Sequence, residues 1–179
     1  MRNLIPLTAL LALAVAACGS SSASDSPQPV EGRATDGPFG LVIQASKSAY
    51  AAGEPILARA VLVYSGPDLG HEVSGSGSGP VMFLVEQVGG RIRTGGAVTA
   101  DCAQYRLEPG RLMVLPFRKS GGFDADDPDA AFLREFLDDP QFRLPVGTWR
   151  IIASGGFIDG PGCDGESVDL SASVTIEVR

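Results

Sequence analysis

The stretch VDLSASVTIEV, residues 168–178, alternates apolar and polar residues without a break. A period of two is the pattern of a β-strand with one face in a core and the other in water. Its apolar face comprises Val168, Leu170, Ala172, Val174, Ile176 and Val178. Strands of parallel sheets are mostly apolar on both faces, so this stretch predicts an antiparallel sheet with one solvated side.

Four earlier stretches also predict short strands. Residues 55–64, PILARAVLVY, are apolar on both faces, which favours a central position in a sheet. Residues 80–88 precede Gly89 and Gly90, and these glycines predict a two-residue hairpin turn into residues 91–94. The other two stretches are GLVIQAS at 40–46 and RLMVLPF at 111–117. With 23 glycines and 13 prolines in 179 residues, many turns are expected, and an all-β sandwich is the predicted fold class.

Residues 128–138 depart from the β pattern and predict a short helix inserted between two strands. Asp127 is a good N-cap, and Pro128 suits the first helical position. The apolar residues of this segment fall on one helical face: Phe132, Leu133, Phe136 and Leu137. Phe132 and Phe136 either close an open edge or end of the sandwich or form an interaction surface for a partner. We favour closure, because an exposed aromatic patch promotes association.

The N-terminal residues predict export and lipid attachment. Residues 1–17 combine Arg2 with an apolar stretch that ends in small residues, as in a secretory signal peptide. This stretch is shorter than the roughly 20 residues of a membrane-spanning helix. The tetrad Val15-Ala16-Ala17-Cys18 resembles the lipobox of bacterial lipoproteins, which implies cleavage before Cys18 and acylation of this cysteine. A buried or disulfide-bonded Cys18 in an ordinary secreted protein is the alternative.

The segment after Cys18 is predicted to be a tether. Residues 18–37 are rich in serine, proline, glycine and acidic residues, and they contain too little apolar surface to fold by themselves. We therefore expect a lipid-anchored flexible tether at 18–37 and one folded domain at 38–179. The predicted location is the extracytoplasmic face of a bacterial cell membrane, with the lipid on Cys18 as the membrane contact.

The remaining cysteines, Cys102 and Cys163, predict one disulfide bond. They form an even pair once Cys18 is assigned to lipid, and an exported protein enters an oxidising compartment. A metal site or a catalytic thiol is the competing interpretation, but two cysteines without a nearby histidine make a poor zinc site.

The charge of the chain excludes one class of partner. The net charge is −7, and removal of residues 1–17 removes Arg2 and no acidic residue, which leaves −8. Such a chain repels phosphate backbones, so nucleic-acid binding is not expected.

Two motifs resemble bacterial immunoglobulin-like domains. Residues 46–68, SKSAYAAGEPILARAVLVYSGPD, are similar to a turn and strand of macroglobulin-type domains and of the intracellular proteinase inhibitor family of bacilli. Residues 144–153, LPVGTWRIIA, resemble the entry to a late strand of the same sandwiches. The resemblance implies an immunoglobulin-like antiparallel β-sandwich, and both motifs are structural turns that carry no activity.

Candidate chemical sites are few. His71 is the one histidine, and we expect it to be solvated in a Gly/Ser loop, because no serine has the flanking glycines of a nucleophile elbow. Residues 160–165, GPGCDG, match a dinucleotide-binding pattern but lack the helix that such a site needs. The acidic cluster from Asp124 to Asp129 does not follow the EF-hand order, which leaves an irregular calcium site or a charged helix start.

These observations predict a non-catalytic, lipid-anchored binding or interaction module of the bacterial cell envelope. It would need no cofactor, and its partner would be an envelope or secreted protein. An inhibitor or accessory subunit of an extracytoplasmic protease or other enzyme is the alternative. A hydrolase is the third class, and the sequence offers no catalytic constellation for it.

Overall fold

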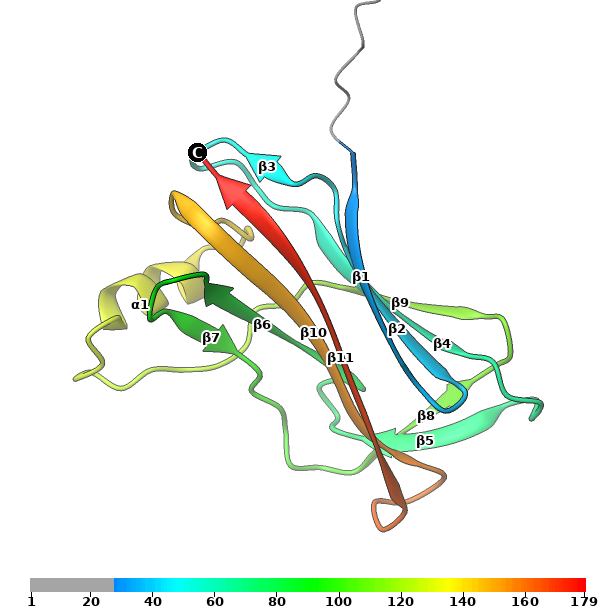
Figure 1. The fold of residues 1–179 in the computed structure, drawn as a ribbon. Helices are drawn as coiled ribbons and strands as arrows, with labels where there is room; N and C mark the ends of the chain where they lie inside the picture. Colours follow the sequence, from blue (N-terminus) through cyan, green and yellow to red (C-terminus); the bar gives the residue numbers. More distant parts are fainter. Residues whose placement is uncertain (1–27) are drawn as a thin grey trace, which may run out of the picture.

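The computed structural model describes residues 28–179, and these form a sandwich of two β-sheets with one helix (Figure 1). The predicted all-β fold with one short inserted helix is confirmed. The predicted signal peptide, Cys18 and half of the predicted tether lie outside the described residues. The elements are β1 Val30–Asp36, β2 Phe39–Ala45, β3 Ala49–Tyr50, β4 Ala58–Tyr64, β5 His71–Gly75, β6 Val81–Gln87, β7 Arg93–Gly95, β8 Ala103–Leu107, β9 Leu112–Pro116, α1 Ala130–Asp138, β10 Gly147–Asp159 and β11 Glu166–Val178.

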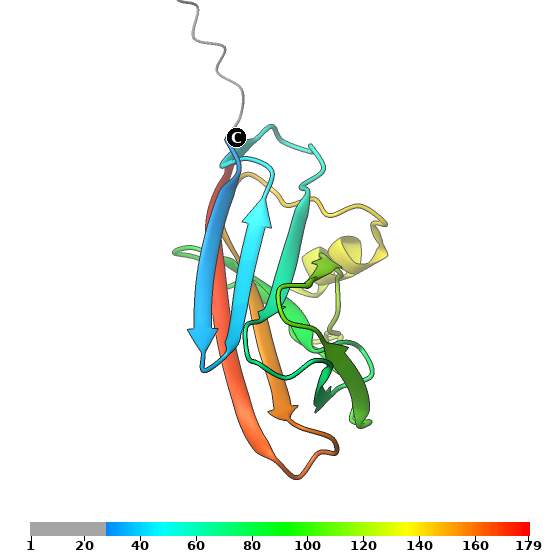
Figure 2. The ribbon, with the colours of Figure 1, turned by 90° about the vertical axis from the view of Figure 1, so that its right-hand side faces the viewer.

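The smaller sheet has the strand order β1-β2-β4-β9, and all its pairs are antiparallel (Figure 2). The sequence prediction of a central position for residues 55–64 is confirmed, because β4 lies between β2 and β9. One edge of this sheet is β1 and the other is β9.

The larger sheet is built on the long hairpin of β10 and β11, in which Gly147 pairs with Val178 and Asp159 with Glu166. Alternate residues of β11 are buried, as its period of two predicts. The far edge of β11 carries β3 in a short parallel pair, so the sheet is not wholly antiparallel. The apolar faces of the two sheets meet in one core that includes Leu41, Leu62 and Trp149.

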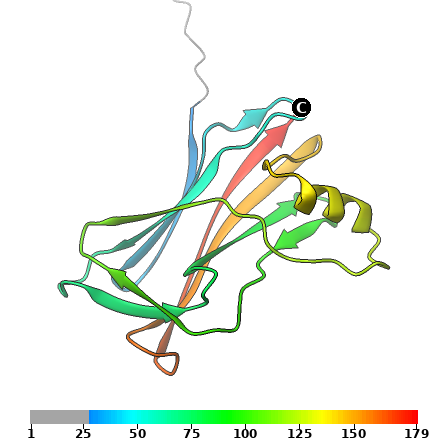
Figure 3. The same cartoon turned by 180° about the vertical axis from the view of Figure 1, so that it is seen from behind.

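The larger sheet divides into two branches along β10. The first part of β10, Trp149 to Gly155, pairs with β6, which carries β7 on its outer side. The last two residues of β10, Ile158 and Asp159, pair with β5, which carries β8. The β6–β7 branch and the β5–β8 branch therefore leave β10 at different points along its length, as the view from behind shows (Figure 3).

The predicted domain boundary at residue 38 is wrong, because β1 belongs to the folded domain. Every residue of β1 pairs with β2, and Asp36 and Phe39 flank a tight turn in which Gly37 has a φ of +53°. The outward residues of β1 are polar and exposed, since it is an edge strand. Its composition therefore resembles that of residues 18–27, and sequence alone does not separate the two segments.

Two local predictions need correction. Helix α1 begins at Ala130 with Asp129 as its N-cap, two residues later than predicted, because the Asp127 carboxylate accepts a hydrogen bond from the Asp129 N–H (2.8 Å). The β6–β7 hairpin is present, but its loop is longer than two residues, since the Gln87 N–H donates to the Ile92 carbonyl (2.9 Å). In the described part of the chain, no helix is long and apolar enough to span a membrane.

Candidate functional site

The predicted disulfide bond between Cys102 and Cys163 is confirmed. Their Cα atoms are 6.1 Å apart, and the bond joins the segment before β8 to the turn between β10 and β11. It therefore ties the β5–β8 branch to the end of the central hairpin, where β10 forms only two backbone pairs with β5.

Helix α1 closes the sandwich with its aromatic residues. Phe136 is 4% exposed, and Phe132 is partly buried, with its ring centroid 6.0 Å from that of Trp149. The Phe136 ring meets Phe142 edge to face at 6.2 Å, and Phe142 stacks on Phe117 at 3.8 Å. Phe136 is thus part of the core, and the proposed interaction surface at Phe132 and Phe136 is wrong for Phe136.

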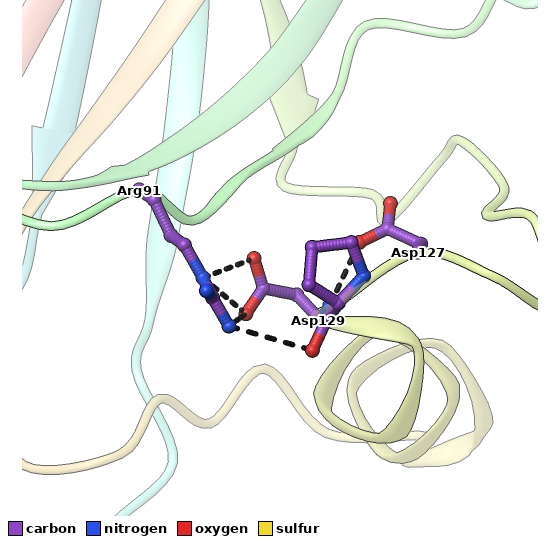
Figure 4. A network of polar contacts seen from close by, with 4 residues as sticks. Arg91, Asp127 and Asp129 are labelled. Carbon is purple, nitrogen blue, oxygen red and sulfur yellow. Dashed lines mark hydrogen bonds and ion pairs between the residues drawn. The ribbon is translucent and has the colours of Figure 1, made fainter.

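Two residues of the acidic cluster, Asp127 and Asp129, make structural contacts at the start of α1. The Asp129 carboxylate accepts hydrogen bonds from Nε and Nη2 of Arg91 at 2.9–3.0 Å, and Asp127 faces the Asp129 backbone (Figure 4). Arg91 lies in the β6–β7 loop, so this pair links the helix to the hairpin. Among the described residues, no group of three or more acidic, histidine or cysteine side chains could hold a metal ion.

Lys119 satisfies the C-terminal end of α1. Its ammonium donates to the backbone carbonyls of Phe136 and Asp139, the latter at 2.7 Å, and burial lowers its pKa. The last carbonyls of a helix have no partners within the helix, so a cation there is favourable. The Asp139 carboxylate accepts a hydrogen bond from the Gln141 N–H and pairs with Arg143, and these contacts lower the pKa of Asp139.

His71 does not lie in a solvated loop, as the sequence had suggested, but in strand β5. Its side chain is 19% exposed, and its ring stacks on Tyr64 with 4.5 Å between centroids. Nε2 lies 2.5 Å from Oδ1 of Asp159, and Nδ1 lies 3.7 Å from Oδ2 of Asp68. Burial raises the pKa of the Tyr64 hydroxyl, and the Asp68 carboxylate adds to this effect. His71 thereby links β5 to the end of β10 at a partly buried position.

A groove of about 520 Å³ opens between β9, the β6–β7 branch and β8. Its walls are largely apolar and come from Met82 and Phe83 of β6, Tyr105 of β8, and Met113 and Leu115 of β9. The loop between β5 and β6 and the segment after β7 complete its rim. This volume falls within the range of about 300 to 1,000 Å³ that is usual for ligand sites.

The groove exists because the larger sheet divides. Were the sheet continuous, the side chains of a further strand would fill the space between the two branches. Instead, the core ring of Phe83 and the partly buried Met113 line an open groove. Sequence reasoning identified 80–88 and 111–117 as strands, but it could not place them on opposite walls of one groove.

The cationic side chains at the Pro116 end of β9 differ in the partners that they bind. Lys119 is occupied by α1, whereas Arg118 takes part in none of the ion pairs found in the described residues. Arg59 of β4, which lies opposite Pro116 in the strand register, donates to the amide oxygen of Gln44 and to no carboxylate. Two arginines without acidic partners among residues 28–179 thus lie near the Pro116 end of β9.

A second groove, of about 560 Å³, lies on the other side of Pro116. Its lining includes the apolar residues Leu57, Ala58 and Phe117 and also Arg59. Pro116 lines both grooves, so the apolar surface continues around the end of β9.

The sequence matches no model of a known protein family, and comparison with curated proteins gives no match. The resemblance of residues 46–68 and 144–153 to immunoglobulin-like domains therefore stays a prediction about the family.

Proposed function

We propose that this chain is a non-catalytic, lipid-anchored binding module on the extracytoplasmic face of a bacterial membrane. The observation that carries the binding role is the groove along β9, which combines an apolar wall with Arg118 at one end, an arginine that has no acidic partner among residues 28–179. Clefts of this composition and size are the usual form of ligand sites.

The lipid anchor is supported by the tetrad that ends at Cys18 and by the cysteine pairing. The disulfide between Cys102 and Cys163 leaves Cys18 as the one cysteine without a disulfide role, and disulfides are typical of exported proteins. A module held in this way would work close to the membrane, through two or more acyl chains that give stable attachment.

The structural contacts of the His71 ring support a non-catalytic role. Its Nε2 atom is bound to Asp159, its other ring nitrogen faces Asp68, and its ring stacks on Tyr64. A general base needs a ring nitrogen within hydrogen-bond reach of the proton that it removes. Here the ring is held by structural contacts on both sides.

The anchor is tested by mass spectrometry of the chain produced in a bacterial host. We expect a mature N-terminus at Cys18 that carries acyl groups, and an uncut, unacylated precursor for the Cys18→Ser variant. An unmodified N-terminus at another residue in the parent protein would exclude lipid anchoring.

The binding role is tested by site-specific photo-crosslinking in intact cells. A photoreactive residue at Val98, which lies in the groove and is half exposed, should give a discrete adduct. The matched control is Val146, which is at least as exposed and lies outside the groove lining. Equal adducts at both positions, or none at either, would contradict binding in the groove.

A further inference from the structure

Within residues 28–179, no strand pairs with the outer edge of β9. Strand β9 is the last strand of the smaller sheet, and its inner edge pairs with β4. The Phe117 N–H donates to the Ala58 carbonyl (3.0 Å), one residue beyond the pairing of Pro116 with Arg59. Because backbone groups of a strand point alternately to either side, the N–H and C=O groups of Leu112 and Val114 point away from β4. They are available to a further strand.

The edge lacks the usual protection against pairing. Natural edge strands carry charges, bulges or prolines that discourage another chain from adding to the sheet. The sequence of β9, LMVLP, contains no charge, and Leu112 and Val114 are 59% and 50% exposed. Pro116 removes one donor at the end of the strand and leaves the two donors before it in place.

The groove lies beside this edge. Met113 and Leu115 of β9 line it, whereas Leu112 and Val114 face outward. Side chains of a strand alternate between the two faces of its sheet. A strand added to β9 would therefore direct every second side chain into the groove, against Met82 and Phe83 of the other branch.

The charge at one end of β9 indicates the polarity of the added strand. Arg118 follows Pro116 by two residues, lines the groove and has no carboxylate partner among the described residues, whereas Arg59 of β4 is bound to Gln44 of β2, on the side away from the outer edge of β9. At the other end, Arg111 is already paired with Glu108 at 3.1 Å. Arg106 also lies at that end, opposite Glu72 in the β5–β8 register, so acidic residues are already present there and a further acidic residue is more complementary to the Pro116 end.

We propose that the groove binds an extended segment of a partner protein, which pairs antiparallel with β9, has apolar residues at alternate positions and carries acidic residues at its N-terminal end. This inference rests on the proposed binding function and specifies its ligand class. Added strands gain affinity from main-chain hydrogen bonds and specificity from pockets for alternate side chains, and both features are present here.

Two synthetic peptides test the proposal by fluorescence anisotropy with the full chain in detergent. One is Asp-Asp-Val-Thr-Val-Thr-Val with capped ends, and the other has Lys-Lys in place of Asp-Asp. We expect the acidic peptide to bind more tightly, and Arg118→Glu to reverse the preference. Equal binding of the two peptides, or a preference that Arg118→Glu leaves unchanged, would overturn the charge assignment.

The strand pairing is tested by Val114→Pro with Val114→Thr as the matched control. Proline removes one outward N–H without breaking a bond to β4, and threonine keeps that N–H. We expect roughly a tenfold loss of affinity for the acidic peptide with proline, which corresponds to one hydrogen bond, and little loss with threonine. Equal affinities of the two variants would overturn strand addition.

Two further measurements distinguish this proposal from dimerisation through β9 and from groove binding without strand pairing. If sedimentation of the parent protein shows a dimer that Val114→Pro dissociates, a second copy occupies the edge and the partner-segment proposal fails. If the crosslink at Val98 forms in cells but Val114→Pro does not reduce it, the groove is a binding site and the strand pairing is wrong. Loss of the crosslink with Val114→Pro, and its retention with Val114→Thr, supports the proposal.

Discussion

At Gly32, β1 approaches the other sheet too closely to leave room for a side chain. A Cβ atom at this position would overlap the backbone carbonyl of Ser173 in β11. Backbone atoms in a paired strand cannot move aside as a flexible side chain can. The absence of a side chain is therefore what lets β1 lie on the sandwich.

We expect Gly32→Ala to lower the free energy of unfolding by about 1–3 kcal/mol, the usual cost of an overpacked site. Urea unfolding followed by circular dichroism measures this loss. Gly156→Ala is the control, because a Cβ atom at Gly156 meets nothing within 4 Å and the residue has no left-handed φ. A loss of equal size in the control would contradict the argument from close approach.

Asp139 is expected to make the folded protein less stable as the pH falls into the acidic range. The Gln141 N–H, and then Arg143, lower its pKa in the folded protein below the ordinary value of about 3.9. A carboxyl whose pKa is depressed by folding contributes stability above its unfolded pKa, and this contribution is lost as the pH falls through the folded pKa. We expect the melting temperature to fall below about pH 4, with a shallower fall for Asp139→Asn. An identical acid profile for the variant would show that Asp139 does not contribute.

At the scale of elements, helix α1 shows how a short insertion becomes part of the core. It is fixed to the β6–β7 loop by Asp129 and Arg91, and its last carbonyls are bound by Lys119 from the segment after β9. Its aromatic residues contact Trp149 of β10 and Phe142. Arg91 and Trp149 are distant from the helix in sequence, so the isolated segment would lack contacts that stabilise the helix in the folded protein.

We expect Phe136→Ala to cost about 3–5 kcal/mol, as for other fully buried phenylalanines, and Phe132→Ala to cost less because that ring is partly exposed. Differential scanning calorimetry of both variants measures the difference. An equal and small effect for the two substitutions would mean that α1 does not close the sandwich.

Some strands could be predicted from their sequences and others could not. Strands β2, β4, β6 and β11 bury one or both faces in the core, so their apolar pattern is strong. Strands β5 and β8 were not predicted, since each is short and includes charged, exposed residues such as Glu72 and Arg106. Their position is decided by pairing with each other and with the end of β10, which are contacts between distant residues.

At the scale of the whole molecule, the disulfide between Cys102 and Cys163 stabilises the less extensively paired branch. The two residues are 61 positions apart, and closing a loop of this length is worth about 4 kcal/mol in the chain-entropy account. We expect reduction to lower the melting temperature by roughly 10 °C and to leave the β-sheet content intact. Cys102→Ser with Cys163→Ser should behave like the reduced protein. Two titratable thiols in the native protein would contradict the bond.

The sequence by itself determined the class of fold, because a period of two in apolar residues is a local property of each strand that faces a core. It also predicted the cysteine pairing, because the proposed acylation of Cys18 leaves Cys102 and Cys163 as the one remaining pair. Tertiary structure alone decided the division of the larger sheet, the contacts of His71 with Tyr64 and Asp159, and the groove beside β9. These features depend on which strand lies next to which, and that choice is made by packing among residues far apart in the chain.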